Sequence, residues 1–342
     1  MNRKILLYLA ITIGLVFVVV ENDAGAAGIY EGKTIRLIVG TSPGGGYDTY
    51  ARAIARHIGK YIPGNPSFIV QNMPGAGSLI AANYLYNVAK PNGLTVAMLI
   101  SGLGMEQMMG TKGIRFDLQK FKWVGAPSVA IPVCAIMGFT GLKTLDQVLN
   151  SKKQLNFGAA GSSTREQPRI LNDFLGANLK VILGYRGTAP IRAAMERKEV
   201  DGACWQWVSM RITARGMLDA KGDDKLIPFV IEGKSQDPEV KDLPQYSEFI
   251  KNKENLAAFK AWLNQYLFFR PFALPPNTPK ERVNILRAAF KQTLQDPDFK
   301  ALAKKLRLDV KYVSGQRIET YIKETLATPS ASKSKLRSII GN

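Results

Sequence analysis

Glycine-rich turns that join strand-like runs to helix-like runs are the feature that most constrains this chain. The first turn, residues 42–48 (SPGGGYD), follows the apolar run 35–40 and precedes a stretch with apolar residues at helical spacing. Similar turns recur at residues 72–78 (NMPGAGS) and 158–163 (GAAGSS). A helix N-terminus presents unpaired backbone amides that can bind an anion. The repetition therefore indicates a protein that holds a small anion.

Six apolar, strand-like runs recur along the chain, mostly with helix-patterned segments between them. They cover residues 35–40, 67–71, 94–101, 154–159, 180–185 and 201–206. This alternation predicts an α/β fold with largely parallel sheets, and the chain length predicts two lobes. Ligands of open α/β sheets bind beyond the carboxyl ends of the strands, where the three turns fall. A fourth turn, residues 184–190 (GYRGTAP), brings Gly187 and Thr188 to another helix entrance.

The N-terminus has the pattern of a cleavable secretory signal. Arg3 and Lys4 precede the apolar run 6–20, and small residues follow at 24–26. This pattern predicts a signal peptide over residues 1–26 and a soluble periplasmic product. The alternative is a transmembrane anchor, which the short apolar run and the acidic residues after it disfavour.

The composition excludes several classes of function. The formal net charge is +19, but the basic residues are scattered and not interleaved with aromatic residues, so we expect no nucleic-acid partner. A basic surface of this kind can steer anions. His57 is the only histidine, which leaves little for a metal cluster or a Ser-His triad. Cys134 and Cys204 are the only cysteines, and both a disulfide and two buried thiols remain open.

Each candidate residue also has a structural explanation. The glycine spacing of residues 43–46 fits neither a P-loop nor a dinucleotide fingerprint, so nucleotide binding loses support. A single glycine turn can simply be a tight connection without a ligand. Asp48 fits a helix cap first and a ligand contact second. Residues 163–166 (STRE) fit a capping box, while their hydroxyls and Arg165 can also bind a carboxylate.

The motifs, taken in order, resemble those of a known family. They are residues 43–48 (PGGGYD), 72–77 (NMPGAG), 161–163 (GSS), 185–190 (YRGTAP), 200–202 (VDG) and 274–279 (LPPNTP). Over nearly the whole chain after the signal peptide, the sequence resembles the substrate-binding proteins of tripartite tricarboxylate transporters, the Bug family of periplasmic receptors.

The resemblance implies a two-lobed periplasmic-binding-protein fold of the Venus-flytrap type. Residues 27–128 and 229–342 would form the first lobe and residues 129–228 the second. A small carboxylate, which can be a tricarboxylate, a dicarboxylate or an aromatic acid, would bind in the cleft and pass to membrane permease subunits. The resemblance also implies a monomer, no cofactor, no metal and no enzymatic activity.

In the family, glycine loops line one wall of the cleft and a Gly-Ser loop lines the other. The ligand-binding residues implied here are Ser42, Gly44, Gly45, Gly46, Asp48, Pro74, Gly75, Gly77, Ser101, Gly161, Ser162, Ser163, Thr164, Arg165, Gly187, Thr188 and Trp205. Arg186 and Trp205 stand where many relatives carry other residues, so the identity of the acid stays open. Trp205 can wall a flat ligand ring or pack in the core.

Two other functions remain as alternatives. One is an exported enzyme that acts on an organic acid with Asp48 as a base, although the chain shows no nucleophile elbow. The other is a sensory receptor that passes its closed form to a signalling protein instead of a permease.

Overall fold

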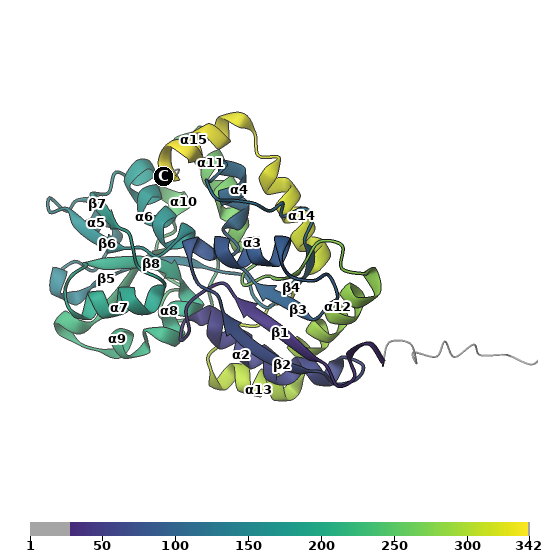
Figure 1. Ribbon diagram of the computed structural model, residues 1–342. Coiled ribbons are helices and arrows are strands. Elements are labelled where there is room, and N and C mark those ends of the chain that lie inside the picture. The colour runs from purple at the N-terminus through teal and green to yellow at the C-terminus, as the bar shows by residue number, and fades with distance from the viewer. Residues whose placement is uncertain (1–27, 341–342) are drawn as a thin grey trace, which may run out of the picture.

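Two α/β lobes lie side by side in the computed structural model, which describes residues 28–340 (Figure 1). The predicted signal peptide, residues 1–26, lies outside the described residues. Within residues 28–340, no helix is both long enough and apolar enough to cross a membrane.

The sheet of the first lobe has six strands. Their order is β11 (Val313–Ser314), β4 (Lys122–Ala126), β10 (Phe272–Leu274), β3 (Thr95–Met98), β1 (Thr34–Val39) and β2 (Ser67–Asn72). β1 pairs in parallel with β2 and β3, whereas β10 and β11 pair antiparallel with their neighbours.

The sheet of the second lobe has five strands. Their order is β7 (Leu179–Ile182), β6 (Leu155–Gly158), β8 (Gly202–Gln206), β5 (Pro132–Met137) and β9 (Leu226–Ile231). β6 is parallel to β7 and β8, and β5 is antiparallel to β8 and β9. The expectation of largely parallel sheets therefore holds for only three strands of each sheet. Apolar periodicity identifies a strand but carries no signal for the direction in which it pairs.

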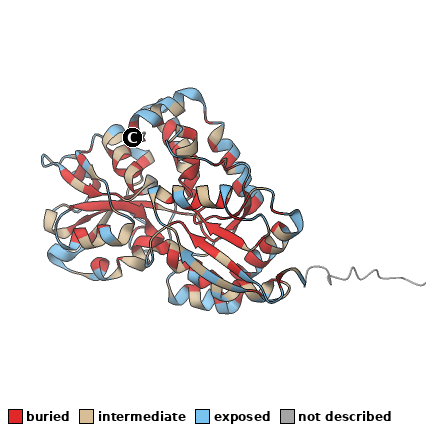
Figure 2. Ribbon diagram, in the orientation of Figure 1, coloured by how far each residue is buried: buried red, intermediate tan, exposed pale blue. Residues whose placement is uncertain are grey.

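Helices cover both faces of each sheet and leave their polar sides in solvent, while the strands are largely buried (Figure 2). Around the first sheet lie α2 (Gly46–Ile58), α3 (Leu79–Asn87), α12 (Lys280–Gln295), α13 (Pro297–Lys305) and α14 (Gly315–Leu326). Around the second lie α5 (Leu145–Leu149), α6 (Ser162–Leu175), α7 (Thr188–Glu196), α8 (Trp207–Thr213), α9 (Arg215–Asp219), α10 (Tyr246–Phe249), α11 (Lys253–Leu263) and α15 (Ser330–Ile340). α4 (Leu103–Met109) lies between the two groups and packs against α14 and α15.

From the strand pairing and helix packing, we infer that the second lobe takes up more of the chain than residues 129–228. The predicted change of lobe between residues 228 and 229 falls inside β9, which pairs with β5 of the second sheet. α11 and α15 then pack on each other, and α15 also packs on α6. These contacts favour a second lobe that runs through α11 and takes up the C-terminal helix, because the buried apolar faces of these helices meet the core of that lobe.

The two cysteines form a disulfide that joins the middle strands of the second sheet. Cys134 on β5 lies directly opposite Cys204 on β8, with their Cα atoms 4.0 Å apart. The bond closes a loop of the chain with a sequence separation of 70 residues. β8 ends at Gln206, where the chain reaches the space between the lobes.

Candidate functional site

A cavity of about 770 Å³ lies between the two lobes. Its walls are the loops that leave the carboxyl ends of the strands: residues 40–47 and 74–80 from the first lobe, and residues 159–165 and 183–189 from the second. This is the position that the topology of open α/β sheets predicts for a ligand.

The first glycine loop opens the N-terminus of α2 toward this cavity. The backbone N–H of Gly44 donates to Asp48 Oδ2 over 3.1 Å, and Gly45 is the residue that precedes the helix. A Cβ atom on Gly46 would lie 2.5 Å from Ser209 Oγ, so any other residue there would displace the Ser209 side chain. Ser42 Oγ donates to the carbonyl of Arg186 over 2.6 Å and thereby connects the two lobes.

The proline-glycine loop requires glycine for its backbone shape. Gly75 has φ +137° and Gly77 has φ +60°, conformations that residues with a side chain rarely adopt. A Cβ atom on Gly161 of the second lobe would lie 3.4 Å from the Cα atom of Gly77, so the loops of the two lobes are nearly in contact. The cavity is therefore narrow between these two loops.

The Gly-Ser loop is closed by the hydroxyl of Thr164. Thr164 Oγ1 accepts the backbone N–H groups of Ala160, at 2.8 Å, and Gly161, at 3.1 Å. In the predicted capping box, the side chain of Glu166 would accept a hydrogen bond from the backbone N–H of residue 163. Instead, Glu166 accepts hydrogen bonds from Trp262 Nε1 at 2.6 Å and Gln265 Nε2 at 2.9 Å. Thr164 is thus the residue that holds the start of α6.

An ion pair between the lobes lines the cavity. Arg165 Nη2 on α6 lies 3.1 Å from Glu106 Oε1 on α4, and Glu106 also accepts from Thr111 Oγ1 at 2.6 Å. Burial raises the pKa of the neighbouring Glu166 to about 7, and the carboxylate of Glu106 adds to the rise. Sequence reasoning missed Glu106 and Thr111, because nothing in the sequence around α4 marks them as part of a site.

Asp48 holds the loops together and does not line the cavity. Besides Gly44, its carboxylate accepts from Arg52 Nε at 2.9 Å and from Asn72 Nδ2 at 3.0 Å. Burial raises the pKa of Asp48, but these hydrogen bonds outweigh it and leave the pKa below its ordinary value. Because Asn72 ends β2, the carboxylate ties the first glycine loop to the second.

The structure brings most of the predicted site residues together. Those that line the cavity are Ser42, Gly45, Gly46, Pro74, Gly75, Gly77, Gly161, Thr164, Arg165, Gly187 and Thr188. Gly44, Asp48, Ser101 and Trp205 are not among the lining residues, and the side chains of Ser162 and Ser163 lie outside the described part of the structure.

Trp205 is the clearest correction among these residues. Its side chain is fully buried in the core of the second lobe, because successive residues of a strand face opposite sides and Gln206 is the one that reaches the cavity. The cavity wall instead contains Tyr47, which lies in the first glycine loop that the sequence predicted to bind the ligand, together with Tyr185 and with Ser209 at the start of α8.

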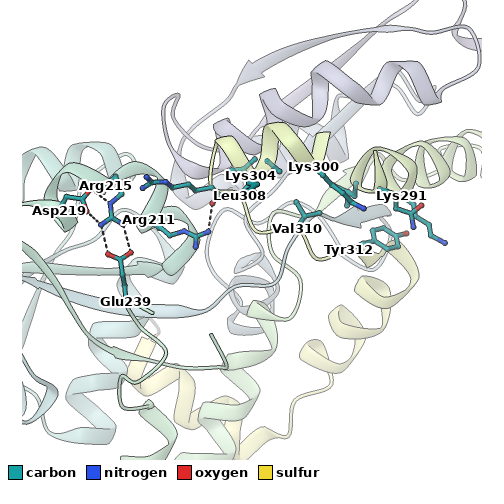
Figure 3. A pocket seen from close by; sticks show the side chains of 14 residues that line it. Arg211, Arg215, Asp219, Glu239, Lys291, Lys300, Lys304, Leu308, Val310 and Tyr312 are labelled. Atoms are coloured by element: carbon teal, nitrogen blue, oxygen red, sulfur yellow. Dashed lines mark hydrogen bonds and ion pairs between the residues drawn. The ribbon is translucent and has the colours of Figure 1, made fainter. Parts of the chain in front are cut away.

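A second cavity, of about 890 Å³, lies between α8 and α9 of the second lobe and α12 and α13 of the first (Figure 3). Long charged side chains line it, and several pair with each other. Arg215 lies between Asp219 and Glu239, and its Nη1 is 2.8 Å from Glu239 Oε2. Lys291 and Lys300 are exposed on the opposite wall. We call this cavity the basic groove.

The described residues show no cluster that could hold a metal ion, taken as three or more His, Cys, Asp or Glu side chains together. The interlobe cavity contains backbone amides, hydroxyls and one acid-base pair. Such a set suits reversible binding of an anion.

The two lobes and the cavity between them define a periplasmic-binding-protein fold. The sequence model of the "Tripartite tricarboxylate transporter family receptor" matches residues 50–335. The chain therefore belongs to this receptor family, which is a family of solute receptors and not of enzymes.

Two relatives of known sequence are similar to this chain at low identity. A UPF0065 protein of Bordetella pertussis is 26% identical over 280 residues, which is 80% of each chain. A UPF0065 protein of Agrobacterium vitis is 26% identical over 285 residues, 80% of this chain and 75% of that protein.

Solved structures agree in fold. The periplasmic binding protein BugD superposes with a TM-score of 0.72 at 20% identity and covers 91% of this chain and 99% of its own. MatC of Rhodopseudomonas palustris, solved with malate, has a TM-score of 0.68 at 21% identity over 90% of this chain and 99% of its own. The R. palustris protein Rpa4515, solved with adipate, has a TM-score of 0.70 at 15% identity over 90% of this chain and 97% of its own.

Proposed function

We propose that this protein is an exported receptor that closes on a small carboxylate and delivers it to the membrane subunits of a tripartite transporter. One observation carries the proposal: the N-termini of α2, α6 and α7, contributed by both lobes, all border the same cavity. Unpaired amides and the helix dipole favour a negative charge at each of them.

The cavity also favours a ligand with an apolar body. Ile80 and Leu183 line it from opposite lobes, and their side chains are about half exposed. Tyr47 and Tyr185 add aromatic surface. Because MatC was solved with malate and Rpa4515 with adipate, a dicarboxylate with a short carbon chain is the first class to test, followed by aromatic acids.

The direct test is a thermal-shift and calorimetric screen of the protein without residues 1–26. Malate, adipate, citrate and benzoate would be compared with uncharged partners such as adipamide. A true ligand at 100 times its Kd adds about 2.7 kcal/mol to the free energy of unfolding. We expect such a shift with at least one acid and none with its amide. If the cavity proves empty by mass spectrometry and no acid shifts the melting temperature, the proposal fails.

The same samples separate the receptor from the exported enzyme. A receptor returns its ligand unchanged, so an NMR spectrum of the acid after prolonged incubation should show no product.

The role of residues 1–26 needs its own measurement, which is the N-terminal sequence of the protein recovered from the periplasm. Transport and not sensing would be supported if deletion of the gene stops uptake of the bound acid.

A further inference from the structure

A fully buried arginine that forms no ion pair within residues 28–340 lies behind one wall of the cavity. Arg270 has no exposed surface. Its guanidinium carbon lies 4.0 Å from the ring centroid of Tyr50, 4.3 Å from that of Phe269 and 5.3 Å from that of Tyr47. The aromatic faces offset part of the cost of burying this charge. Arg270 also has φ +62°, a backbone conformation that a residue with a side chain rarely adopts.

The hydrogen bonds of Arg270 go to hydroxyl groups. Nη1 donates to Ser128 Oγ over 3.1 Å and Nη2 donates to Ser209 Oγ over 2.6 Å, while Nε has no hydrogen-bond partner among the described atoms. Within residues 28–340, Arg270 makes no ion pair. Asp309 exerts an electrostatic influence on it, but the carboxylate of Asp309 pairs with Arg211 at 2.9 Å.

Within residues 28–340, no carboxylate therefore pairs directly with the charge of Arg270, and Asp309, which acts on it at a distance, is paired with Arg211. Burial lowers the pKa of the guanidinium, which is the direction expected for a cation that has lost its water. An arginine nevertheless keeps its proton in proteins. A buried charge without a partner is unfavourable, so its presence calls for a counter-charge from outside the chain.

Very little separates this charge from the interlobe cavity. Ser209 and Tyr47 line the cavity, and both contact the guanidinium. A Cβ atom on Gly46 would lie 3.0 Å from Arg270 Nη2, so the backbone at the start of α2 rests directly on the guanidinium. Ser209 Oγ accepts from Arg270, which leaves its own O–H able to donate into the cavity.

We propose that Arg270 is a positioning residue that supplies the counter-charge for the ligand's carboxylate through the hydroxyl of Ser209 and the N-terminus of α2. This inference rests on the proposed receptor function. It predicts that the receptor distinguishes an ionised acid from its amide mainly at this wall. A hydrogen bond polarised by a cation is stronger than a neutral one, and the low-dielectric surroundings enhance the effect.

The chain offers a matched pair of variants for the test. Ser209→Ala removes the hydroxyl on the cavity side of Arg270, and Ser128→Ala removes the hydroxyl on its other side, which does not line the cavity. Arg270→Met removes the charge and keeps a long side chain. The probe is adipate, with adipamide as its uncharged counterpart, and each affinity is measured by calorimetry on protein whose fold is checked by circular dichroism.

We expect Arg270→Met to weaken adipate binding about 30-fold and Ser209→Ala about 10-fold, with Ser128→Ala within about two-fold of wild type. The ratio of adipate to adipamide affinity should fall in the first two variants only. Unchanged adipate binding in Ser209→Ala and Arg270→Met overturns the inference and leaves the receptor function intact. An equal loss in Ser128→Ala and Ser209→Ala also overturns it, because a purely structural role of Arg270 would produce that result. If the wild-type protein binds no acid of the panel, the receptor function itself fails and takes the inference with it.

Discussion

The interlobe cavity and the basic groove have similar volumes, about 770 and 890 Å³, but their walls differ in chemistry. Backbone amides, small side chains and buried hydroxyls form much of the wall of the interlobe cavity, and hydrogen bonds within the chain orient the hydroxyls of Thr164 and Ser209. Long lysine and arginine side chains form much of the groove, where Arg211 and Arg215 pair with acids and Lys291 and Lys300 are exposed. Volume alone would favour the groove, so the comparison teaches that preorganised donors, and not size, distinguish a binding site.

Both cavities lie between the lobes, and one short helix borders both. α8 presents Ser209 to the interlobe cavity and Arg211 to the groove. Arg211 Nη1 lies 2.6 Å from Asp237 Oδ2, and its Nη2 lies 2.9 Å from Asp309 Oδ1 on the chain that follows α13. A movement of the lobes would therefore alter both cavities, but only one of them is built to hold an anion.

The largest expected effect comes from filling the interlobe cavity. Gly45 has φ −89°, and a Cβ atom there would meet nothing closer than 3.8 Å, so a leucine can be accommodated by the backbone but projects into the space for the ligand. We expect Gly45→Leu to weaken ligand binding by about 100-fold or more, which corresponds to about 2.7 kcal/mol. Lys300→Leu places the same side chain in the groove and should leave the affinity within about two-fold. Equal losses in the two variants, measured by calorimetry, would remove the distinction between the cavities.

The sequence predicted those parts of the interlobe cavity in which the backbone conformation requires glycine. Gly46, Gly77 and Gly187 were identified because strand-to-helix turns with unpaired backbone amides need glycine. All three line the interlobe cavity in the structure. The two-lobed α/β fold followed from the alternation of apolar patterns and from the family resemblance.

The remaining features depend on contacts between distant parts of the chain. Arg165 and Glu106 are 59 positions apart, and no local pattern shows that they meet. Trp205 and Gln206 are adjacent, and no sequence pattern decides which of them faces the cavity. Arg270 lies in a short apolar and aromatic stretch of the sequence, which carries no signal for a buried charge behind a ligand site.

A smaller effect is expected from Asp48, which supports the interlobe cavity from behind. Asp48→Asn replaces one carboxylate oxygen by an NH2 group, so one of the N–H groups that now donate to the carboxylate loses its acceptor. We therefore expect a loss of about 1–2 kcal/mol in the free energy of unfolding near pH 7. Because the folded state lowers the pKa of Asp48 from 3.8, this stabilisation is complete above that value and disappears as the pH falls through the lower folded pKa. Denaturant titrations of wild type and variant should therefore converge only in strong acid. A difference that is constant with pH would show that the charge of Asp48 contributes nothing.

The smallest expected effects come from two acids that each pair with an arginine, one in each cavity. Glu106→Gln removes a negative charge that faces the ligand and frees Arg165, so we expect an approximately five-fold tighter binding of a dicarboxylate. Glu239→Gln removes one of the two acids that pair with Arg215 in the groove, while Asp219 remains, and should change the affinity by less than about two-fold, because water and salt screen its exposed site. Calorimetry in the same buffer measures both. Weaker binding in Glu106→Gln would mean that the pair acts mainly as a clasp between the lobes, whose loss outweighs the relief of repulsion. A change in Glu239→Gln as large as that in Glu106→Gln would instead show that the groove communicates with the ligand, and the two cavities would then have to be treated as one functional unit.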